Sequence, residues 1–560
     1  MATYDSWGND SERFADGSLC IGIDLGTTNS CVGLWLVERN HVKILKNRAD
    51  RGRTTPSVVH FLPDSDSVVV GNAALAQRSP AGNTIRSVKR LLGQPYKSKA
   101  VSVAKSFAAY DIVATPQGNA AVEISRRGER VRVQPEEVSS HVLAELKASA
   151  EAYWADGSTR IDNAVITVPA YFSDAQRTAT LLSAEMAGFK AVRLLNEPTA
   201  AAMAYGLFVA GDKTVVVVDF GGGTLDVSLM HINDGLFEVL GIGGDTHLGG
   251  DDVTHVLMEH VLENVQKHHR EVTRSALSAG DLAQLRRVVE DAKIVLSTED
   301  ETELALSQFA GIASFTLRLT RRKLELLGDG IWKRCLRILS NVLAEADVAP
   351  HDVDEVIMVG GSTRIPILRA QISEFFGGKE LCLSVNADEV VCEGAAIQAA
   401  ILSGMDRKVF RDVLMMDVIP LSIGLEKADG TMEVLLPKNS RIPVTVTKYF
   451  ETFEDDQPGL SIDVYEGEHE VAKENDHICL FNFAIPRDKI AKAGAVAHPV
   501  TFTMNASGVL QVQAGIHHDS EEAPMSTTAL VLMALYIAAL FALYVFSRIY
   551  FASDRDLTLT

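Results

Sequence analysis

A repeated strand–turn–strand pattern restricts the fold of this chain more than any other feature. Residues 21–36 read IGIDLGTTNSCVGLWL, and residues 215–230 read VVVVDFGGGTLDVSLM. Each run has an apolar strand, an aspartate, a glycine-containing turn with threonine, and a second strand. A third glycine-rich turn, IMVGGSTRIP at 357–366, lies between an apolar strand and a helix. None is a Walker A motif, and any one alone has an ordinary interpretation as a turn. Because such turns bring backbone N–H groups close to an anion, the set predicts two related lobes around one phosphate chain.

The surrounding pattern predicts an α/β region followed by a β-domain. Up to about residue 404, short apolar runs such as NAVITVP alternate with segments of helical period such as DAQRTATLLSAEMAG. From DVIPLSIGL onwards the runs are short, alternating and separated by turn residues, which is typical of an antiparallel β-domain. The expected organisation is an α/β domain at 19–405, a linker at 406–417, a β-sandwich at 418–516 and a polar spacer at 517–526.

Composition excludes several classes of protein. The 560 residues carry a formal net charge of -20, which argues against a nucleic-acid partner. The 6 cysteines include no CxxC and no paired spacing. This usage is typical of reduced thiols rather than of a disulfide framework or a zinc site.

A long apolar segment near the carboxy terminus predicts a membrane helix. Residues 527–546, TTALVLMALYIAALFALYVF, contain no charged side chain, and about 20 such residues cross a bilayer as a helix. The alternative is a buried core helix.

The first 18 residues lack the apolar run of a signal peptide. We therefore expect a single-pass tail anchor with a tail at 547–560 and the body in the cytosol, although Arg548 favours the opposite orientation. The sequence does not specify the membrane; the endoplasmic reticulum is favoured.

Several longer motifs support a family resemblance. GIDLGTTNSCVG, NEPTAAAMAYGL, VVVDFGGGTLDVS, GDTHLGGDD, VGGSTRIP and GAAIQAAILSG resemble the seventy-kilodalton heat-shock chaperones, the DnaK-like family, over roughly residues 19–516. The resemblance implies an α/β actin-like two-lobed ATPase domain, a hydrophobic linker, and an antiparallel β-sandwich that binds peptides. It also implies ATP or ADP and Mg²⁺ as cofactors, with K⁺ as an additional ion.

The resemblance assigns the phosphate end of a nucleotide site to the hairpin turns, at Gly26, Thr27, Thr28, Asn29, Gly221, Gly222, Gly223 and Thr224. It implies that Asp24, Glu197 and Asp219 hold Mg²⁺, mostly through water. Phosphoryl transfer depends on positioning and charge neutralisation. The implied catalytic residues are accordingly Lys89, Glu197, Asp219, Thr224 and Asp226, with Asp219 or Asp226 orienting the attacking water. The local sequence alone would place Lys89 on the solvated surface.

The adenosine end of the site departs from the family pattern. Glu290, Lys293 and Ser297 share a helix face and match adenosine contacts, and the pocket is completed by Gly360, Gly361, Ser362, Arg364 and Asp388. Ile294 occupies the position of an arginine that usually stacks on adenine. Either this change weakens ATP binding, or Ile294 packs against the base as apolar cover.

Residues that couple the domains are also implied by the resemblance. Pro169 and Arg177 match the proline switch and the relay arginine, and Arg193 and Asp417 match positions that receive a J-domain partner. The apolar DVLMM run is expected to dock in one state and to be released in another. The alternative interpretation of this run is a plain edge strand.

In the β-domain, the resemblance implies a groove for extended apolar peptides. Leu425, Phe450, Leu460 and Ile462 match the lining of its pocket, and Ala428 and Phe453 match the pair that arches over the bound chain. For Leu460 and Ile462, a place in the sandwich core is the alternative. The helical lid of the family is not expected, because only the spacer 517–526 separates the sandwich from the apolar segment. The acidic carboxy-terminal motif of some relatives is also missing.

The predicted function is a membrane-tethered, ATP-dependent chaperone that binds unfolded or nascent polypeptides. The implied partners are a J-domain co-chaperone, a nucleotide exchange factor and, through the carboxy-terminal helix, a membrane. One alternative is a regulator or exchange factor of another chaperone. A second is a small-molecule kinase, since the actin-like fold also supports sugar kinases, but the linker and the sandwich argue against it.

Overall fold

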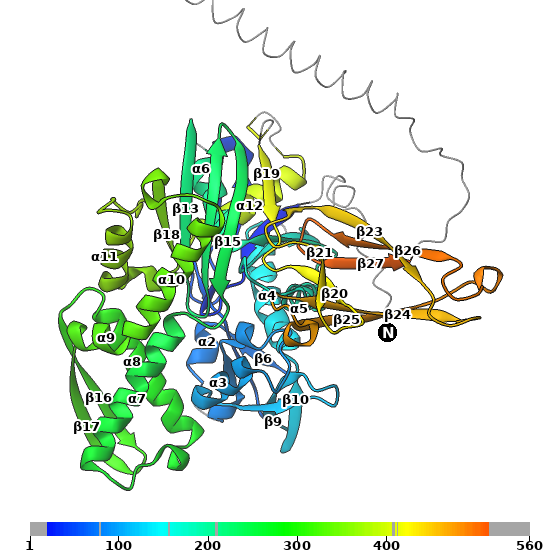
Figure 1. Cartoon of the computed structure of the whole chain (residues 1–560). Coiled ribbons are helices and arrows are strands. Elements are labelled where there is room, and N and C mark those ends of the chain that lie inside the picture. The colour runs from blue at the N-terminus through cyan, green and yellow to red at the C-terminus, as the bar shows by residue number, and fades with distance from the viewer. Residues whose placement is uncertain are drawn as a thin grey trace, which may run out of the picture.

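The computed structural model describes residues 19–77, 80–154, 157–207, 211–405, 409–410 and 413–514. Two α/β lobes lie side by side, and a β-sandwich projects from them (Figure 1). We call residues 19–207 together with helix α12 (Val390–Leu402) lobe I, and residues 211–375 lobe II. The sandwich comprises residues 419–514.

Lobe I is built on a sheet with the order β12-β11-β1-β2-β3. Its strands are β12 (Ala191–Asn196), β11 (Asn163–Val168), β1 (Cys20–Asp24), β2 (Asn29–Leu36) and β3 (His41–Ile44), with the short β4 (Thr55–Pro56) paired to β2. β1 is parallel to β11 and antiparallel to β2. Helix α12 packs against β1 and β2, and the sheet is also contacted by α4 (Pro135–Glu151), α5 (Asp174–Met186) and α6 (Glu197–Gly206).

Lobe II repeats this arrangement. Its sheet has the order β18-β13-β14-β15-β19-β22. The strands are β18 (Glu355–Val359), β13 (Asp212–Phe220), β14 (Leu225–Asn233), β15 (Leu236–Asp245), β19 (Leu414–Val418) and β22 (Arg441–Ile442). The β13–β14–β15 meander with parallel β18 corresponds to the β1–β2–β3 meander with parallel β11. Residues 215–218 of β13 are fully buried, as expected for a continuous valine run in a sheet covered on both faces. The duplicated hairpins predicted from the sequence are therefore present.

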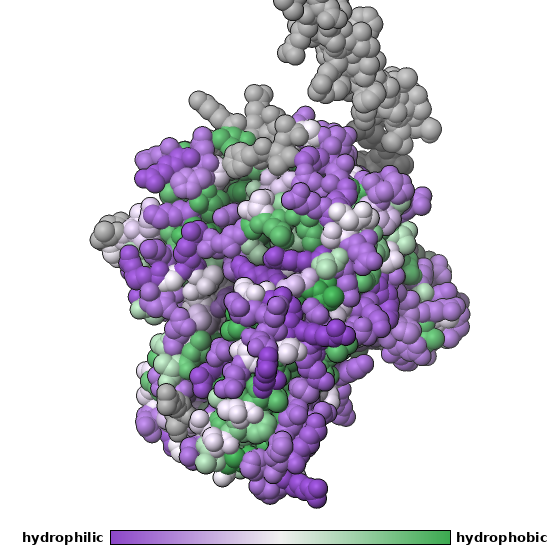
Figure 2. All heavy atoms as spheres, turned by 90° about the vertical axis from the view of Figure 1, so that its left-hand side faces the viewer, coloured by the Kyte–Doolittle hydropathy of each residue, from purple (hydrophilic) through white to green (hydrophobic). Residues whose placement is uncertain are grey.

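Smaller elements complete both lobes. Lobe I adds β5 (Val58–Phe61), β6 (Val68–Val70), β7 (Thr84–Arg86), β8 (Asp111–Ala114), β9 (Ala120–Arg126), β10 (Glu129–Val133), α2 (Asn72–Leu75) and α3 (Lys99–Phe107). Lobe II adds the hairpin β16 (Glu301–Phe309) and β17 (Ile312–Thr320) and the helices α7 (Gly250–His268), α8 (Ala279–Val295), α9 (Arg321–Leu327), α10 (Asp329–Glu345) and α11 (Pro366–Phe375). Hydrophilic residues predominate on the lobe II face in Figure 2, with smaller hydrophobic areas between them.

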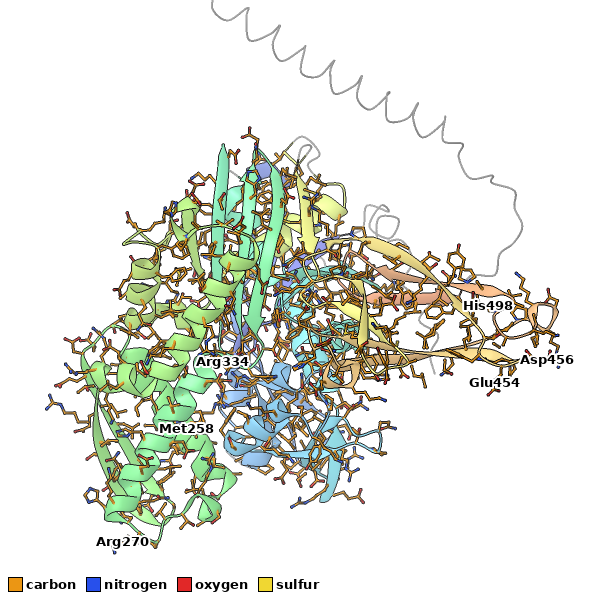
Figure 3. The ribbon with its side chains drawn as sticks, in the orientation of Figure 1. Met258, Arg270, Arg334, Glu454, Asp456 and His498 are labelled. Carbon is orange, nitrogen blue, oxygen red and sulfur yellow. The ribbon has the colours of Figure 1, made fainter. Side chains whose placement is uncertain are left out.

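The sandwich consists of two antiparallel sheets with the orders β21-β20-β24-β25 and β23-β26-β27. The strands are β20 (Ile423–Glu426), β21 (Met432–Leu436), β23 (Val444–Glu451), β24 (Gly459–Glu466), β25 (Asp476–Ala484), β26 (Ala497–Met504) and β27 (Leu510–Ala514). Alternate residues face inwards, as the sequence pattern predicts. The β23–β24 turn, with Glu454 and Asp456, is at the tip farthest from the lobes (Figure 3).

The segment between lobe and sandwich is a strand rather than a free linker. β19 (Leu414–Val418) pairs in parallel with β15, with Leu414 opposite Leu236, and β22 (Arg441–Ile442) of the sandwich region pairs with β19. Residues 414–416 of the DVLMM run are thus docked on lobe II, in a strand that lies between β15 and β22.

No helix in the described part of the chain is both long and apolar enough to cross a membrane. The segment for which a membrane helix is predicted, residues 527–546, lies outside that part. The tail anchor stays a prediction.

Candidate nucleotide-binding site

The three glycine-rich turns meet at a cavity of about 610 Å³ between the lobes. Most of the residues predicted for a nucleotide site line it: Asp24, Gly26, Thr27, Thr28, Asn29, Lys89, Glu197, Asp219, Gly221, Gly222, Thr224, Glu290, Lys293, Ile294, Ser297, Gly360, Gly361, Ser362, Arg364 and Asp388. Gly223 and Asp226 do not line the cavity and lie beside it. Residues spread over most of the chain therefore converge on one space.

The turns of the two hairpins face each other. A Cβ atom on Gly222 would be 2.0 Å from Thr28 Oγ1, and one on Gly223 would be 2.5 Å from Thr27 Oγ1. Any side chain at either position would collide with the opposite turn. These contacts explain why the second hairpin needs glycine in its turn, which keeps its backbone N–H groups accessible to an anion.

Three carboxyl groups and one lysine lie at the base of the cavity, with the carboxyl group of Asp226 beside them. Asp219, Asp226 and Glu197 are buried, and Asp24 is half-buried. Lys89 is also buried, with 5% exposure, so the surface position suggested by its local sequence is wrong. Its Nζ donates to Glu197 Oε1 at 2.5 Å and to the carbonyl oxygen of Leu25 at 2.7 Å.

The electrostatics of this group favour an additional cation. Burial, and then the charge of Glu197, raises the pKa of Asp24 to about 7. Burial raises the pKa of Asp226 to about 7 and that of Asp219 well above its ordinary value. A bound divalent cation would reverse these shifts, because it stabilises the ionised carboxylates.

These residues fit Mg²⁺ held mostly through water. Within the described ranges, no group of three or more His, Cys, Asp or Glu side chains is arranged to bind a metal ion directly. Asp226 Oδ2 is buried and has no hydrogen-bond partner in the part of the chain that the structure describes. Mg²⁺ commonly keeps several waters and binds phosphate oxygens, so carboxylates around it can act through those waters.

The opposite end of the cavity is formed by α8 and by the turn after β18. Lys293 Nζ forms an ion pair with Glu290 at 2.8 Å and donates to the carbonyl oxygen of Gly250 at 3.0 Å. Arg364 pairs with both oxygens of Asp388, at 3.2 and 2.8 Å. Ile294 lines the rim and is 59% exposed.

Three of the four predicted coupling residues surround a second cavity of about 210 Å³, between lobe I, β19 and the sandwich. Arg177, Arg193 and Asp417 line it. Pro169 lies nearby, and its carbonyl oxygen accepts a hydrogen bond from Phe172 N. Asp417 accepts from Thr199 Oγ1 at 3.1 Å.

The predicted peptide-binding residues separate into two groups. Leu425 and Ile462 belong to the sandwich core, Phe450 packs against that core, and Leu460 is buried at 7% exposure. Ala428 is exposed and Phe453 is 88% exposed. Core packing thus accounts for Ile462 without a peptide, and the peptide pocket stays a prediction.

Sequence reasoning missed several residues of the nucleotide cavity: Thr54, Asp251, Thr298, Val359, Ile365, Arg369, Ala387 and Val391. Asp251 accepts from Ser87 Oγ of lobe I at 2.7 Å and pairs with Arg286 at 2.6 Å. Although burial opposes ionisation, Arg286 and Arg90 lower the pKa of Asp251 to about 2. Asp251 belongs to the GDTHLGGDD motif, and this was the sequence feature that could have identified it.

Comparison with known proteins identifies the family. A family model described as Hsp70 protein matches residues 20–530. The chain belongs to the Hsp70 family. The heat shock cognate HSP70 protein of Trypanosoma brucei brucei is 41% identical over 502 residues, covering 88% of this chain and 72% of the relative. The heat shock 70 kDa protein of Neurospora crassa is 42% identical, covering 88% and 75%. The heat shock 70 kDa protein BIP3 of Oryza sativa subsp. japonica is 41% identical, covering 88% and 73%.

Hsp70 membership establishes the general activity. Hsp70 proteins are ATPases that bind ATP or ADP with Mg²⁺, and they act as chaperones with unfolded polypeptides and co-chaperones. The chain is therefore an ATPase of the Hsp70 chaperone type.

Proposed function

We propose that the chain is a membrane-tethered Hsp70 chaperone in which ATP hydrolysis in the cavity between the lobes controls the affinity of the sandwich for apolar client segments. The observation that carries this proposal is a continuous set of contacts from the nucleotide site to the sandwich. It begins at Asp226, whose Oδ1 accepts the N–H of Tyr171 at 3.0 Å.

Arg177 continues this set of contacts. Its guanidinium donates to the carbonyl oxygens of Ala170 and Phe172, which flank Tyr171, at 3.0 and 3.2 Å. It also donates to the carbonyl oxygen of Ser507 in the sandwich at 3.2 Å. A movement of the 169–172 segment on hydrolysis would therefore reach the sandwich directly, which is the physical requirement for coupling two domains.

In this proposal, the cavity residues have the roles that the family pattern implies. The hairpin turns hold the phosphates, Asp24, Glu197 and Asp219 position the Mg²⁺ and its waters, and Lys89 approaches the γ-phosphate. Bound Mg²⁺ would neutralise negative charge on the γ-phosphoryl group that is transferred. Asp219 or Asp226 orients the attacking water, and α8 with the 360–364 turn holds the adenosine.

The client site is proposed at the outer part of the sandwich. Phe453 lies in the β23–β24 turn, beside Glu454 at the tip in Figure 3. The Phe453 side chain is 88% exposed, so a bound apolar peptide would remove apolar surface from water there. We retain the domain limits 19–405, 406–417 and 418–516, and add that β19 lies in the second range except for its last residue, Val418.

The membrane tether is proposed from the uncharged 527–546 segment, with the spacer 517–526 before it. The spacer is too short for a helical lid between sandwich and membrane, so bound clients should leave the groove quickly. Tethering would offset this loss by raising the local concentration of the chaperone at one surface.

A cytosolic body is supported by the sequon Asn505-Ala506-Ser507. Ser507 is 4% exposed and its Oγ accepts the N–H of Leu194 of lobe I at 3.2 Å. A glycan on Asn505 would lie at this interface and oppose docking of the sandwich, whereas a protein facing the cytosol escapes such modification.

Two experiments test the proposal. Steady-state ATP hydrolysis by the full-length chain should rise when a J-domain and an apolar peptide are added; no response to either would favour the regulator or exchange-factor alternative. Carbonate extraction should leave the full-length chain in the membrane fraction and release a chain that ends at Pro524. A full-length chain released by carbonate would exclude the tether while leaving the chaperone assignment intact.

A further inference from the structure

Lobe I has a further cavity, of about 670 Å³, which shares no lining residue with the nucleotide cavity. Its walls are β3, the turn at 46–53 and the end of α4 near Tyr153. We call it the basic groove, because Arg39, Lys43, Lys46, Arg48, Arg51 and Arg53 line it and, among the residues that the structure describes, no aspartate or glutamate does. Such a concentration of cations stands out in a chain with a net charge of -20.

Part of this charge is already neutralised. Arg48 pairs with Glu145 and Arg53 with Glu389, each at 2.7 Å. Lys43 lies over the ring of Tyr153, 4.5 Å from its centroid. In contrast, Arg39, Lys46 and Arg51 are exposed, and none has an ion-pair partner within the described ranges. These three cations are available to an anionic ligand.

The turn that carries the arginines is held in place by hydrogen bonds. Asn47 N donates to the carbonyl oxygen of Gly52 at 2.8 Å, Asp50 N donates to Asn47 Oδ1 at 2.9 Å, and Gly52 N donates to Asp50 Oδ1 at 2.8 Å. The Asn47 amide also donates to the carbonyl oxygen of Thr54 at 3.1 Å. Because the turn is already ordered, a ligand would bind with little further loss of backbone entropy.

The groove also offers an open sheet edge. β3 is the last strand of the lobe I sheet. Leu45 N donates to the carbonyl oxygen of Val32, which fixes the alternation of the β2–β3 ladder. The backbone N–H and C=O groups of Val42 and Ile44 consequently point away from β2, and both residues line the groove. No strand of the described chain pairs with this edge.

We propose that the basic groove binds an acidic polypeptide segment of a partner protein, in extended conformation, as an additional strand on β3. The cations favour a ligand with carboxylate side chains. The edge of β3 favours an extended polypeptide, because a polypeptide backbone supplies both N–H donors and C=O acceptors at alternate positions. A polyphosphate or a nucleic-acid strand could use Arg39, Lys46 and Arg51, but its phosphates have no donors for the carbonyl oxygens of Val42 and Ile44. The combination therefore favours an acidic peptide.

A direct binding experiment tests this proposal. The full-length chain in neutral detergent is titrated against a fluorescent peptide of alternating glutamate and valine, and binding is followed by anisotropy. The Arg39→Glu/Lys46→Glu variant should bind at least about tenfold more weakly, since charge reversal replaces attraction with repulsion. The matched control is Arg270→Glu/Arg322→Glu, which alters two exposed cations of lobe II, including Arg270 at its lower tip (Figure 3), and should bind like the unaltered chain.

A second peptide tests the contribution of the strand edge. The same sequence, N-methylated at alternate peptide nitrogens, keeps its charge but loses the donors for β3, and should also bind at least about tenfold more weakly. Equal affinity of the Arg39→Glu/Lys46→Glu variant and the unaltered chain would overturn the groove as the site. Equal binding of the N-methylated peptide, or tighter binding of tripolyphosphate or duplex RNA through the same cations, would overturn the acidic-strand ligand.

Discussion

At the scale of a single residue, Lys89 forms a buried ion pair and is also a predicted catalytic residue. Its buried ammonium pairs with Glu197, and its charge opposes the rise that burial causes in the pKa of Asp24. We predict that Lys89→Ala lowers the single-turnover rate of ATP hydrolysis by about 10²–10³-fold, as expected when one preorganised charge is lost from a phosphoryl-transfer site. Nucleotide binding should be largely retained.

Stability has to be measured alongside this rate, because removing one partner of a buried ion pair costs about 3–5 kcal/mol. A Lys89→Ala/Glu197→Gln double variant relieves the unpaired buried charge and serves as the control for folding. Single-turnover hydrolysis that stays unchanged in folded Lys89→Ala protein would remove Lys89 from the reaction.

Ile294 gives a prediction about affinity. Its side chain is 59% exposed at the cavity rim, so an arginine fits there without a clash. We expect Ile294→Arg to tighten ATP binding by about 1–2 kcal/mol through stacking and cation–π contact with adenine. Calorimetric titration measures the change, and Val295→Arg, at a neighbouring position outside the cavity, is the matched control. Equal or weaker affinity would favour the interpretation of Ile294 as adequate apolar cover.

At the scale of an element, β19 is held by main-chain pairing and by a few apolar side chains. Met415 packs against the core cluster that includes Val215 and Ile232, whereas Leu414 on the same strand is 57% exposed. We predict that Met415→Asp releases β19 from β15, because burial of a methionine contributes about 1.5–3 kcal/mol. Leu414→Asp should have little effect.

Limited proteolysis measures this release. Cleavage between residues 405 and 418 should become at least about tenfold faster in Met415→Asp, which corresponds to 1.4 kcal/mol or more of lost docking. The same variant should lose stimulation of its ATPase by apolar peptide. Equal cleavage rates for the two variants would mean that the backbone ladder alone holds the strand.

At the scale of the whole molecule, docking of the sandwich depends on two neighbouring carboxyl groups. Glu466 of β24 is 5% exposed and accepts the N–H of Asp174 of α5 at 3.1 Å, and Asp174 accepts the N–H of Leu510 at 2.7 Å. Burial, and then the charge of Asp174, raises the pKa of Glu466 to about 8, and burial raises the pKa of Asp174 to about 6. In the separated domains both groups would return to ordinary values near 4.

The docked arrangement thus binds more protons than the separated domains. Docking should be strongest at acid pH, should weaken as the pH rises through about 6, and should weaken further through about 8. Energy transfer between dyes at positions 270 and 456 would follow the distance between lobe II and the sandwich tip. Glu466→Gln should remove the step near pH 8 and keep the domains docked above it, while the exposed Glu470→Gln should retain the step. A pH-independent distance in the unaltered chain would contradict this prediction.

The local features of the molecule were determined by the sequence. An aspartate at a strand end followed by a glycine–threonine turn specifies a hairpin through backbone geometry alone, so the two phosphate turns and the duplication of the lobes could be predicted. The alternating runs after residue 418 specified the sandwich strands for the same reason. Family motifs then placed most of the cavity-lining residues, because each motif is a short continuous segment.

Contacts between distant segments were decided only by the tertiary structure. The burial of Lys89, the approach of Asp251 to Ser87 across the lobes, and the contact of Glu466 with Asp174 join residues that no periodicity relates. The basic groove likewise forms only because the end of α4 lies beside β3. Lys43 and Tyr153, which are in contact there, are more than 100 residues apart in the sequence. Burial, pKa and charge pairing depend on which surfaces the lobes and the sandwich bring together, and that is a property of the packed chain rather than of any local sequence pattern.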